Sequence, residues 1–330
     1  MNVRPGGHDE KGMYEAHFGF RHLPFGLTPD TRFFYTKASH QEALNTVLFA
    51  LRSGEGFLKV TGEIGLGKTL LCRQLLNGLG PEFVAAYVPN PAVTPDALFR
   101  SVAEELGCTV ATGDGPSELL KVIHERLLMH AREQRRSVLV VDEAQALSDY
   151  TLEAIRLLTN LETETYKLLQ VVLFGQPELD QRLSQPSLRQ LRQRITFSHR
   201  LRPLGSGEFI EYVRHRLEVA GAPRAGLFSN DALSLLFRAS RGTPRLINIL
   251  CHKALLAAFG PGKAGVGRAE ALAAIQDTES ASLSGAEQFG MFLRQNIFVI
   301  ALAVGVGLAC GYVLSFPLPA YVYDWFPKRP

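Results

Sequence analysis

The chain has 330 residues, of which 46% are apolar and 20% are charged, so its composition is that of a globular protein and not a disordered one. The 35 basic and 32 acidic residues leave a net charge of +3, too small to indicate nucleic-acid binding by electrostatics alone. The four cysteines, Cys72, Cys108, Cys251 and Cys310, lie far apart and lack CxxC spacing. This pattern argues against a zinc site or a disulfide framework and indicates a reducing compartment.

The N-terminal residues 1–12 lack the apolar stretch of a signal peptide, so we expect a flexible leader there, with translation starting at either Met1 or Met13. The following segment is rich in aromatic residues, and Pro24 and Pro29 prevent a long helix in it. Its seven aromatic residues are Tyr14, Phe18, Phe20, Phe25, Phe33, Phe34 and Tyr35. Either the segment packs irregularly on the core, or it forms a surface that docks a partner.

Apolar runs and helical patterns alternate from Ser39 to residue 204, the region that we assign with the aromatic segment to one domain over 13–204. Ser39 and Glu42 have the spacing of a capping box and predict the start of a helix. Strands are predicted at 56–61, 83–88, 137–142, 168–174 and 195–201. Further helices are predicted near 67–79, 95–107, 117–134, 149–161 and 177–193. This alternation predicts an α/β fold whose parallel sheet is covered by helices on both faces.

Only helical patterns continue after residue 204, so we expect a small all-α domain over 205–277. The stretch 278–296 has the composition of a linker.

Residues 62–69 read GEIGLGKT, a complete GxxxxGKT phosphate-binding loop between a predicted strand and a predicted helix. In such a loop backbone amides wrap the phosphates at a helix N-terminus, the lysine reaches the β and γ oxygens, and the threonine hydroxyl binds Mg²⁺. Lys68 and Thr69 hold these two positions. The predicted nucleotide-binding residues are Gly62, Glu63, Ile64, Gly65, Leu66, Gly67, Lys68, Thr69 and Leu70.

The apolar run at 138–141 ends in Asp142 and Glu143, which supply the second half of such a site. A carboxylate at this strand end lies beside Mg²⁺, so Asp142 is a predicted metal ligand together with Thr69. Glu143 is then placed to polarise the water that attacks the γ-phosphate. The sequence has no NKxD motif for guanine, so ATP and Mg²⁺ are the predicted ligands and hydrolysis the predicted reaction.

Polar residues after the fourth predicted strand and before the fifth fit an oligomeric ATPase. Gln176 either senses the γ-phosphate and orients water, or is an ordinary turn residue. Of Arg189, Arg192 and Arg194, we favour Arg194 as the group that reaches the ATP of a neighbouring subunit. The alternative is a solvated basic helix face.

Arg245 lies in a GTPR stretch at the start of a predicted helix of the all-α region. Thr243 can cap that helix, and Pro244 fits its first turn. Arg245 is therefore expected to face the nucleotide, unless it is an ordinary surface arginine. It completes the predicted catalytic set with Glu143, Gln176 and Arg194.

Several characteristic motifs occur together in the chain: HFGF at 17–20, LTPD at 27–30, the phosphate-binding loop, VVDEAQ at 140–145, FGQPEL at 174–179, LRQLRQRI at 188–195 and GTPRLINILCHKALLAA at 242–258. Through these motifs the chain resembles, over about 13–280, the AAA+ ATPases, and within them the A component of the general (type II) secretion pathway and its pilus-biogenesis relatives. On LRSGEGF at 51–57, GKTLLCRQLLN at 67–77 and DTES at 277–280, its closest likeness is to the ATPases of MSHA type IV pilus biogenesis. The resemblance implies a doubly wound, parallel five-stranded P-loop sheet with a helical lid. It also implies a homo-oligomer that couples ATP hydrolysis to assembly of an envelope machine together with inner-membrane proteins.

Residues 297–316 carry no charge, and eleven of these twenty residues are Ile, Leu, Val or Phe. Twenty helical residues rise about 30 Å, the thickness of the hydrocarbon core. We therefore expect one C-terminal transmembrane helix in a bacterial inner membrane. The positive-inside rule does not support an orientation, but ATP and reduced cysteines place the ATPase domain in the cytoplasm and the tail, 317–330, in the periplasm.

Secretion-pathway A components continue beyond their span into a large peptidoglycan-binding region, whereas only 317–330 follow here. Direct peptidoglycan binding is therefore not expected. Two other functions stay open: a DNA-directed ATPase of the transposition or initiator type, and a scaffold that binds ATP with little turnover. The small net charge and the predicted span argue against nucleic acid as a partner.

Overall fold

A computed structural model describes residues 14–35, 39–89, 94–162, 167–223 and 226–281. The predicted leader, most of the linker, the predicted membrane span at 297–316 and the tail at 317–330 lie outside these residues. Among the helices within the described ranges, none is both long and apolar enough to cross a membrane.

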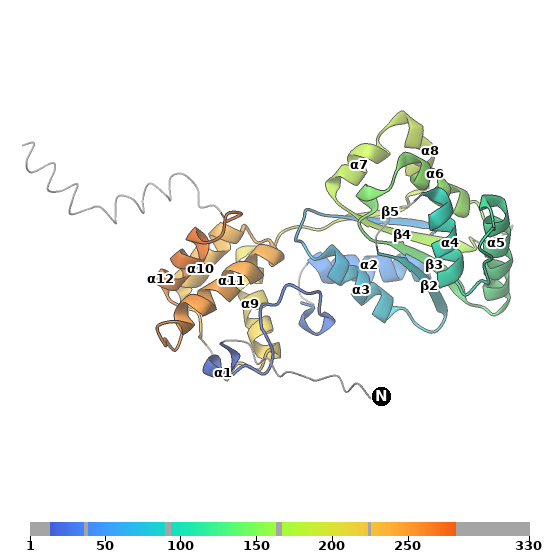
Figure 1. Cartoon of the computed structure of the whole chain (residues 1–330). Helices are drawn as coiled ribbons and strands as arrows, with labels where there is room; N and C mark the ends of the chain where they lie inside the picture. Colours follow the sequence, from blue (N-terminus) through green and yellow to red (C-terminus); the bar gives the residue numbers. More distant parts are fainter. Residues whose placement is uncertain (1–13, 36–38, 90–93, 163–166, 224–225, 282–330) are drawn as a thin grey trace, which may run out of the picture. The chain divides into compact units, whose positions relative to one another are not determined.

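Five parallel strands form one sheet in the order β2-β3-β4-β1-β5 (Figure 1). Their bounds are β1 Phe57–Thr61, β2 Phe83–Val88, β3 Arg136–Val141, β4 Leu169–Gly175 and β5 Phe197–Arg200. All four neighbouring pairs are parallel, which confirms the predicted five-stranded sheet. Each strand lies within two residues of its predicted bounds.

Successive side chains of β3, which lies between β2 and β4, enter two separate apolar clusters, as the alternation of a strand requires. Val138 and Val140 lie in the cluster covered by α2 (Ser39–Arg52) and α3 (Lys68–Gly78). Leu139 and Val141 belong to the cluster on the opposite face. Because both faces are covered, β3 ends in four consecutive apolar residues, 138–141, each worth about 1.5–3 kcal/mol when fully buried.

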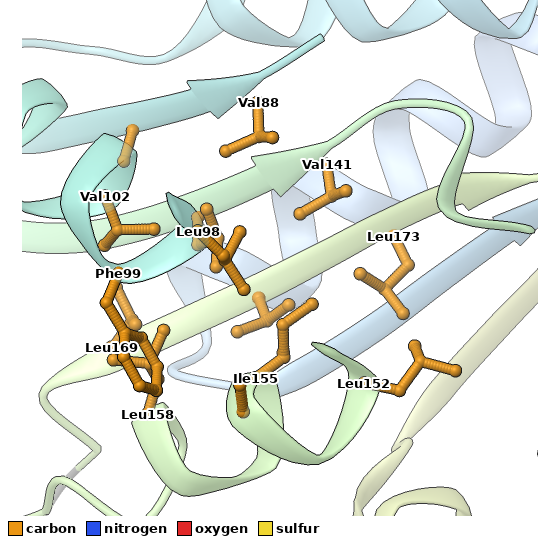
Figure 2. Close-up of a cluster of buried hydrophobic side chains, with 14 of the residues drawn as sticks. Val88, Leu98, Phe99, Val102, Val141, Leu152, Ile155, Leu158, Leu169 and Leu173 are labelled. Carbon is orange, nitrogen blue, oxygen red and sulfur yellow. The ribbon is translucent and has the colours of Figure 1, made fainter. Parts of the chain in front are cut away.

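The helices of the opposite face cover the second cluster, part of which is drawn in Figure 2. They are α4 Pro95–Glu105, α5 Pro116–Arg132, α6 Asp149–Leu158, α7 Pro177–Leu183 and α8 Arg189–Arg194. In Figure 2, Phe99 of α4 and Ile155 of α6 lie among strand side chains such as Leu169 and Leu173. This packing fixes the strands, whose carboxyl ends carry the predicted site residues.

Two local predictions are wrong. The helix expected over 177–193 is broken: α7 ends at Leu183, a 3-10 turn covers Pro186–Leu188, and α8 begins at Arg189. Pro186 explains the break, because a proline disfavours helical backbone at the preceding residue and cannot donate a helical hydrogen bond. The Ser39 hydroxyl donates to the Arg202 carbonyl at 3.4 Å, which is not the predicted capping contact.

In the part of the chain that the structure describes, four helices follow the sheet: α9 Ser206–Val219, α10 Asn230–Ser240, α11 Pro244–Phe259 and α12 Arg268–Gln276. Helices α10, α11 and α12 pack against one another (Figure 1). Their inward side chains, among them Leu235, Leu250 and Leu255, are buried. We call this helical group the lid.

The aromatic segment forms the short helix α1 (Glu15–Phe18) and a 3-10 turn, η1 (Thr31–Phe33). All seven of its aromatic side chains are buried, so these rings pack inside the fold and do not form an exposed docking surface. The Tyr14 hydroxyl is 2.7 Å from Nδ1 of His252 in α11. Burial raises the pKa of Tyr14 above its ordinary value, so the hydroxyl stays protonated.

Candidate nucleotide-binding site

Strand β4 lies between β1 and β3 in the sheet, so the carboxyl ends of these three parallel strands lie next to one another. Thr61 is level with Gly175, and Val141 is level with Leu173. Each of these strands leads directly into predicted site residues: 62–69, Gln176, and Asp142 with Glu143. The edge formed by strand carboxyl ends is where open α/β sheets bind ligands.

The phosphate-binding loop turns into α3 through two glycines in left-handed conformation. Gly65 has φ +82° and Gly67 has φ +88°, backbone angles that residues other than glycine rarely adopt. Helix α3 begins at Lys68, so its free amide groups lie at the loop, where they favour an anion.

The Lys68 ammonium lies inside the loop, where Nζ donates to the carbonyls of Gly62 at 2.8 Å and Glu63 at 3.1 Å. Burial lowers the pKa of Lys68, while the nearby carboxylates of Glu143 and Asp142 oppose that shift. A buried cation at this position, next to the amides that begin α3, suits the phosphates of a nucleotide.

Asp142 is only 2% exposed, and burial raises the pKa of its carboxyl group above the ordinary value. The carboxylate accepts hydrogen bonds from the Thr69 hydroxyl and from the Glu143 amide, the latter at 2.9 Å. A carboxylate and a hydroxyl in contact are oxygen ligands of the kind that Mg²⁺ uses with phosphate oxygens. The donor set therefore fits the predicted ion, with Asp142 and Thr69 as its protein ligands.

Glu143 is held by two glutamine side chains. Its Oε2 accepts from Gln145 Nε2 at 2.6 Å and from Gln176 Nε2 at 3.3 Å. The Gln145 Oε1 in turn accepts from the Gln176 backbone amide at 3.0 Å. Glu143 also has φ +51°, a strained value for this residue type. The structure thus brings Gln176 and Glu143 together and adds Gln145, which sequence reasoning did not assign.

Arg182 of α7 forms hydrogen bonds with the turn that carries Gln145. Its Nη1 donates to the Gln145 carbonyl at 2.9 Å and also to the Leu147 carbonyl. Its Nη2 bonds to Asp149 Oδ1 at the start of α6. The turn that carries Gln145 is therefore fixed by a guanidinium from the neighbouring helix.

The lid meets the phosphate-binding loop at Arg245, whose backbone amide donates to the Gly65 carbonyl at 3.1 Å. A Cβ on Gly65 would lie 2.9 Å from the Arg245 Cβ, so this contact needs a glycine. Pro244 is in the first turn of α11, as expected, but the Thr243 side chain makes no capping hydrogen bond, so that prediction is wrong.

His40 of α2 is a further residue that the sequence did not single out. Its Nε2 forms a hydrogen bond with the Leu66 carbonyl, and a Cβ on Gly67 would lie 3.4 Å from this nitrogen. Burial lowers the pKa of His40 below its ordinary value, which favours the neutral ring. The neutral ring can donate its Nε2–H to the carbonyl and so hold the loop.

A cavity of about 380 Å³ connects these parts. We call residues 24–35 the strap, and a stretch of it forms the first wall of the cavity. The second wall is the phosphate-binding loop together with Glu143 and Gln176, and the third wall is the lid. The lining residues are Gly26, Leu27, Thr28, Pro29, Asp30, Ile64, Gly65, Gly67, Lys68, Thr69, Leu70, Glu143, Gln176, Tyr212, Arg216, Pro244, Arg245 and Asn248. The loop residues predicted to bind phosphate and the residues predicted to activate water, Glu143 and Gln176, therefore line one cavity together with Arg245, whose side chain is exposed.

Comparisons with known proteins agree with this architecture. The AAA domain family matches residues 51–183. General secretion pathway protein A of Aeromonas hydrophila is 40% identical over 318 residues, which cover 96% of this chain and 56% of that protein. The chain therefore carries an AAA domain and is related to general secretion pathway protein A. It spans little more than half of that relative's length, so the relative's whole activity is not transferred to it.

Two solved structures share the fold at low sequence identity. The ORC1 protein of Aeropyrum pernix, solved in complex with DNA, is 20% identical with a TM-score of 0.56, covering 77% of this chain and 69% of that one. The RuvB Holliday junction branch migration motor of Thermotoga maritima is 15% identical with a TM-score of 0.51, covering 81% and 80%. At these identities the likeness concerns the fold alone.

Arg194, the arginine predicted to act on a neighbouring subunit, does not line the cavity of its own chain. Arg194 is half-buried at the end of α8 and donates from Nη1 to the Thr159 hydroxyl at 2.8 Å. Arg189 and Arg192 are exposed. Gly62, Glu63, Leu66 and Asp142 also lie outside the cavity lining, although each belongs to the loop or strand end beside it.

The strap end of the cavity was missed entirely as a site. Leu27 and its neighbours were used only for the family resemblance, and Tyr212, Arg216 and Asn248 were given no role. A sequence signal existed for Asn248 alone, because it follows Arg245 by three residues and so lies on the same helix face.

Proposed function

We propose that this AAA+ ATPase hydrolyses Mg²⁺-bound ATP and uses the cycle to drive or organise assembly of a type IV (MSHA-like) pilus or a type II secretion machine. The observation that supports hydrolysis best is the placement of Glu143, whose carboxylate is held by Gln145 and Gln176 across the cavity from Lys68 and Thr69.

Each residue has a defined task in this proposal. The amides at the start of α3 and the Lys68 ammonium hold the phosphates, and Thr69 with Asp142 would hold Mg²⁺. The ion would neutralise charge on the β and γ oxygens. Glu143 accepts a proton from water, while Gln176 keeps the Glu143 carboxylate in place and contacts the γ-phosphate. Arg245 brings a lid cation to the phosphates, and Arg194 serves a neighbouring subunit in a homo-oligomer.

The direct test is phosphate release by the purified full-length chain in detergent, measured with Mg²⁺ and again with excess EDTA. Turnover that depends on the metal and disappears in Lys68→Ala supports hydrolysis. Nucleotide binding without release above the Lys68→Ala background favours the scaffold function.

The assembly role rests on relatedness to general secretion pathway protein A and on residues 297–316, which we propose cross the inner membrane once with the ATPase in the cytoplasm. Its test is cross-linking in membranes followed by purification of a Glu143→Gln variant that retains ATP. Co-purification of pilus or secretion inner-membrane proteins is expected. Recovery of DNA in their place would reverse the assignment in favour of a DNA-directed ATPase.

A further inference from the structure

Arg216 of α9 is a buried cation that the proposed hydrolysis does not use. It is 5% exposed and lines the nucleotide cavity. Within the described ranges its hydrogen-bond partners are neutral oxygens, and its guanidinium lies over the rings of Phe33, 4.7 Å from the centroid, and Tyr212, 5.7 Å away. Burying a charge is unfavourable unless opposite charges or hydrogen bonds compensate. The pKa of the Asp30 carboxyl group is lowered mainly by its hydrogen bond to Arg32 and in part by the charge of Arg216, so one carboxylate of the cavity wall lies within electrostatic reach of Arg216. The role of this buried arginine is therefore to be found in the groups that its hydrogen bonds hold in place.

Two of these hydrogen bonds fix the main chain of the strap. Nε donates to the Pro24 carbonyl at 2.6 Å, and Nη2 donates to the Gly26 carbonyl at 3.4 Å. The cavity wall begins at Gly26 and ends at Asp30. At the far end of this wall, Arg73 of α3 donates to the Pro29 carbonyl at 2.8 Å. Hydrogen bonds from two guanidinium groups thus hold the two ends of the wall: Arg216 on the lid, and Arg73 on α3, the helix that begins at the phosphate-binding loop.

A third hydrogen bond connects Arg216 to the helix that carries Arg245. Arg216 Nη1 donates to the Tyr212 hydroxyl at 2.8 Å, and this hydroxyl lies 3.0 Å from Asn248 Oδ1. Because arginine only donates, the hydroxyl accepts from Arg216 and donates to Asn248, which fixes the direction of the relay. Tyr212 and Asn248 are both buried, and Asn248 lies on α11 three residues after Arg245.

We propose that Arg216 is a positioning residue for nucleotide binding, which sets the Gly26–Asp30 wall through main-chain carbonyls and is tied to α11 through Tyr212 and Asn248. These hydrogen bonds position the part of the cavity that is distant from Lys68. They therefore govern the affinity for nucleotide, whereas Glu143 carries out the hydrolytic step. The proposal rests on the proposed function only in taking ATP as the ligand.

The cleanest variant is Tyr212→Phe, which keeps the buried ring and removes the single hydroxyl that joins Arg216 to Asn248. Full-length protein is compared with wild type for ATP dissociation constant, KM, kcat and thermal midpoint. We expect the dissociation constant and KM to rise about three- to tenfold, the effect of one buried hydrogen bond, with kcat within about twofold. Tyr150→Phe makes the same chemical change at a side chain that is 81% exposed, and it is expected to match wild type.

Hydrogen exchange supplies a readout that simple destabilisation would not move. ATP is expected to protect backbone amides of 26–35 in wild type and in Tyr150→Phe, and to protect them less in Tyr212→Phe at saturating ATP. Arg216→Lys keeps the charge but cannot serve two carbonyls and a hydroxyl together, so its affinity loss should exceed that of Tyr212→Phe.

The outcomes separate this proposal from the proposed function. If wild type binds and hydrolyses ATP while Tyr212→Phe binds it equally well, the positioning role is wrong and the ATPase function stands. A fall in kcat at unchanged KM would also overturn it. If wild type binds ATP without hydrolysing it, the affinity and exchange measurements still decide the positioning role. Absence of ATP binding by wild type overturns both.

Discussion

At the phosphate end of the cavity, the groups that would meet ATP are amides and side chains from the loop at 62–70 and from two neighbouring strand ends. At the strap end, the lining residues 26–30 are held through main-chain carbonyl oxygens of the strap, which accept hydrogen bonds from the guanidinium groups of Arg216 and Arg73. The first end is rigid because a parallel sheet holds it. The second depends on contacts between the strap, α3 and the lid, so its shape changes if those elements shift. We expect the phosphate end to control turnover and the strap end to control affinity.

The largest effect is expected for Glu143→Gln, which removes the carboxylate but preserves the hydrogen-bonding shape of the side chain. Loss of a general base typically lowers a rate by 10²–10⁴-fold, so kcat should fall by about that factor while ATP affinity stays within about threefold. Rapid-quench turnover and equilibrium binding on the same sample measure both. A variant that turns over at the wild-type rate would remove Glu143 from the chemistry.

Lys68→Ala tests the other side of the phosphate end and should act on binding. Removing a buried cation next to several phosphate charges is expected to weaken ATP binding by about 100-fold, or roughly 2.7 kcal/mol. Titration with a fluorescent ATP analogue measures the change. Lys121→Ala on the exposed side of α5 is the matched control. Equal affinities for the two variants would contradict the role of Lys68.

Gly65→Ala probes the contact between the loop and the lid. The substitution forces alanine to φ +82° and places its Cβ 2.9 Å from the Arg245 Cβ. Gly54→Ala is a matched control, because Gly54 has φ +86° but nothing within 4 Å of its Cβ position. Both should lose about 1–2 kcal/mol of unfolding free energy from backbone strain. Only Gly65→Ala should also lose ATP affinity, by about tenfold, and equal affinities would show that the lid contact is unimportant.

The smallest effect concerns pH and the histidine beneath the loop. Burial lowers the pKa of His40 in the folded chain, with nearby Glu208 opposing and His199 adding to this shift. The unfolded chain therefore takes up the proton first as pH falls, so stability is full above about pH 6.5–7 and declines below it, by at most about 1.4 kcal/mol per pH unit. Urea unfolding between pH 7.5 and 5.5 should show a shallower decline in His40→Gln than in wild type. His22→Gln, at an exposed position, should decline as wild type does.

The two ends also differ in how much of them the sequence predicts. The GEIGLGKT loop and the Asp142-Glu143 pair predict the phosphate end of the cavity, because binding phosphate and Mg²⁺ needs particular residue types at short spacing beside a strand. Arg216 and Pro24 are 192 residues apart, and the accepting group is a main-chain carbonyl that any residue carries. No local pattern can indicate such a contact. The Gln145 bond to Glu143 was missed for a smaller reason: the VVDEAQ motif was assigned roles only as far as Glu143.

Among the elements, the strands were predictable because consecutive apolar residues buried on both faces leave a strong signal. The break in the expected helix at 177–193 was also present in the sequence as Pro186, and a helical pattern on both sides of it obscured it. Thr243 occupies the N-cap position of α11, as its residue type predicted, but its side chain makes no capping hydrogen bond, which residue type alone does not guarantee.

The division of labour between the two ends is tested most directly by the initial rate as a function of ATP concentration for Gln145→Ala and Tyr212→Phe, measured side by side. Gln145 lies outside the cavity lining but holds Glu143 at 2.6 Å, so its loss should lower the plateau about tenfold without moving KM. Tyr212→Phe should raise KM three- to tenfold with the plateau within about twofold. Curves in which both variants change the same parameter would contradict the account.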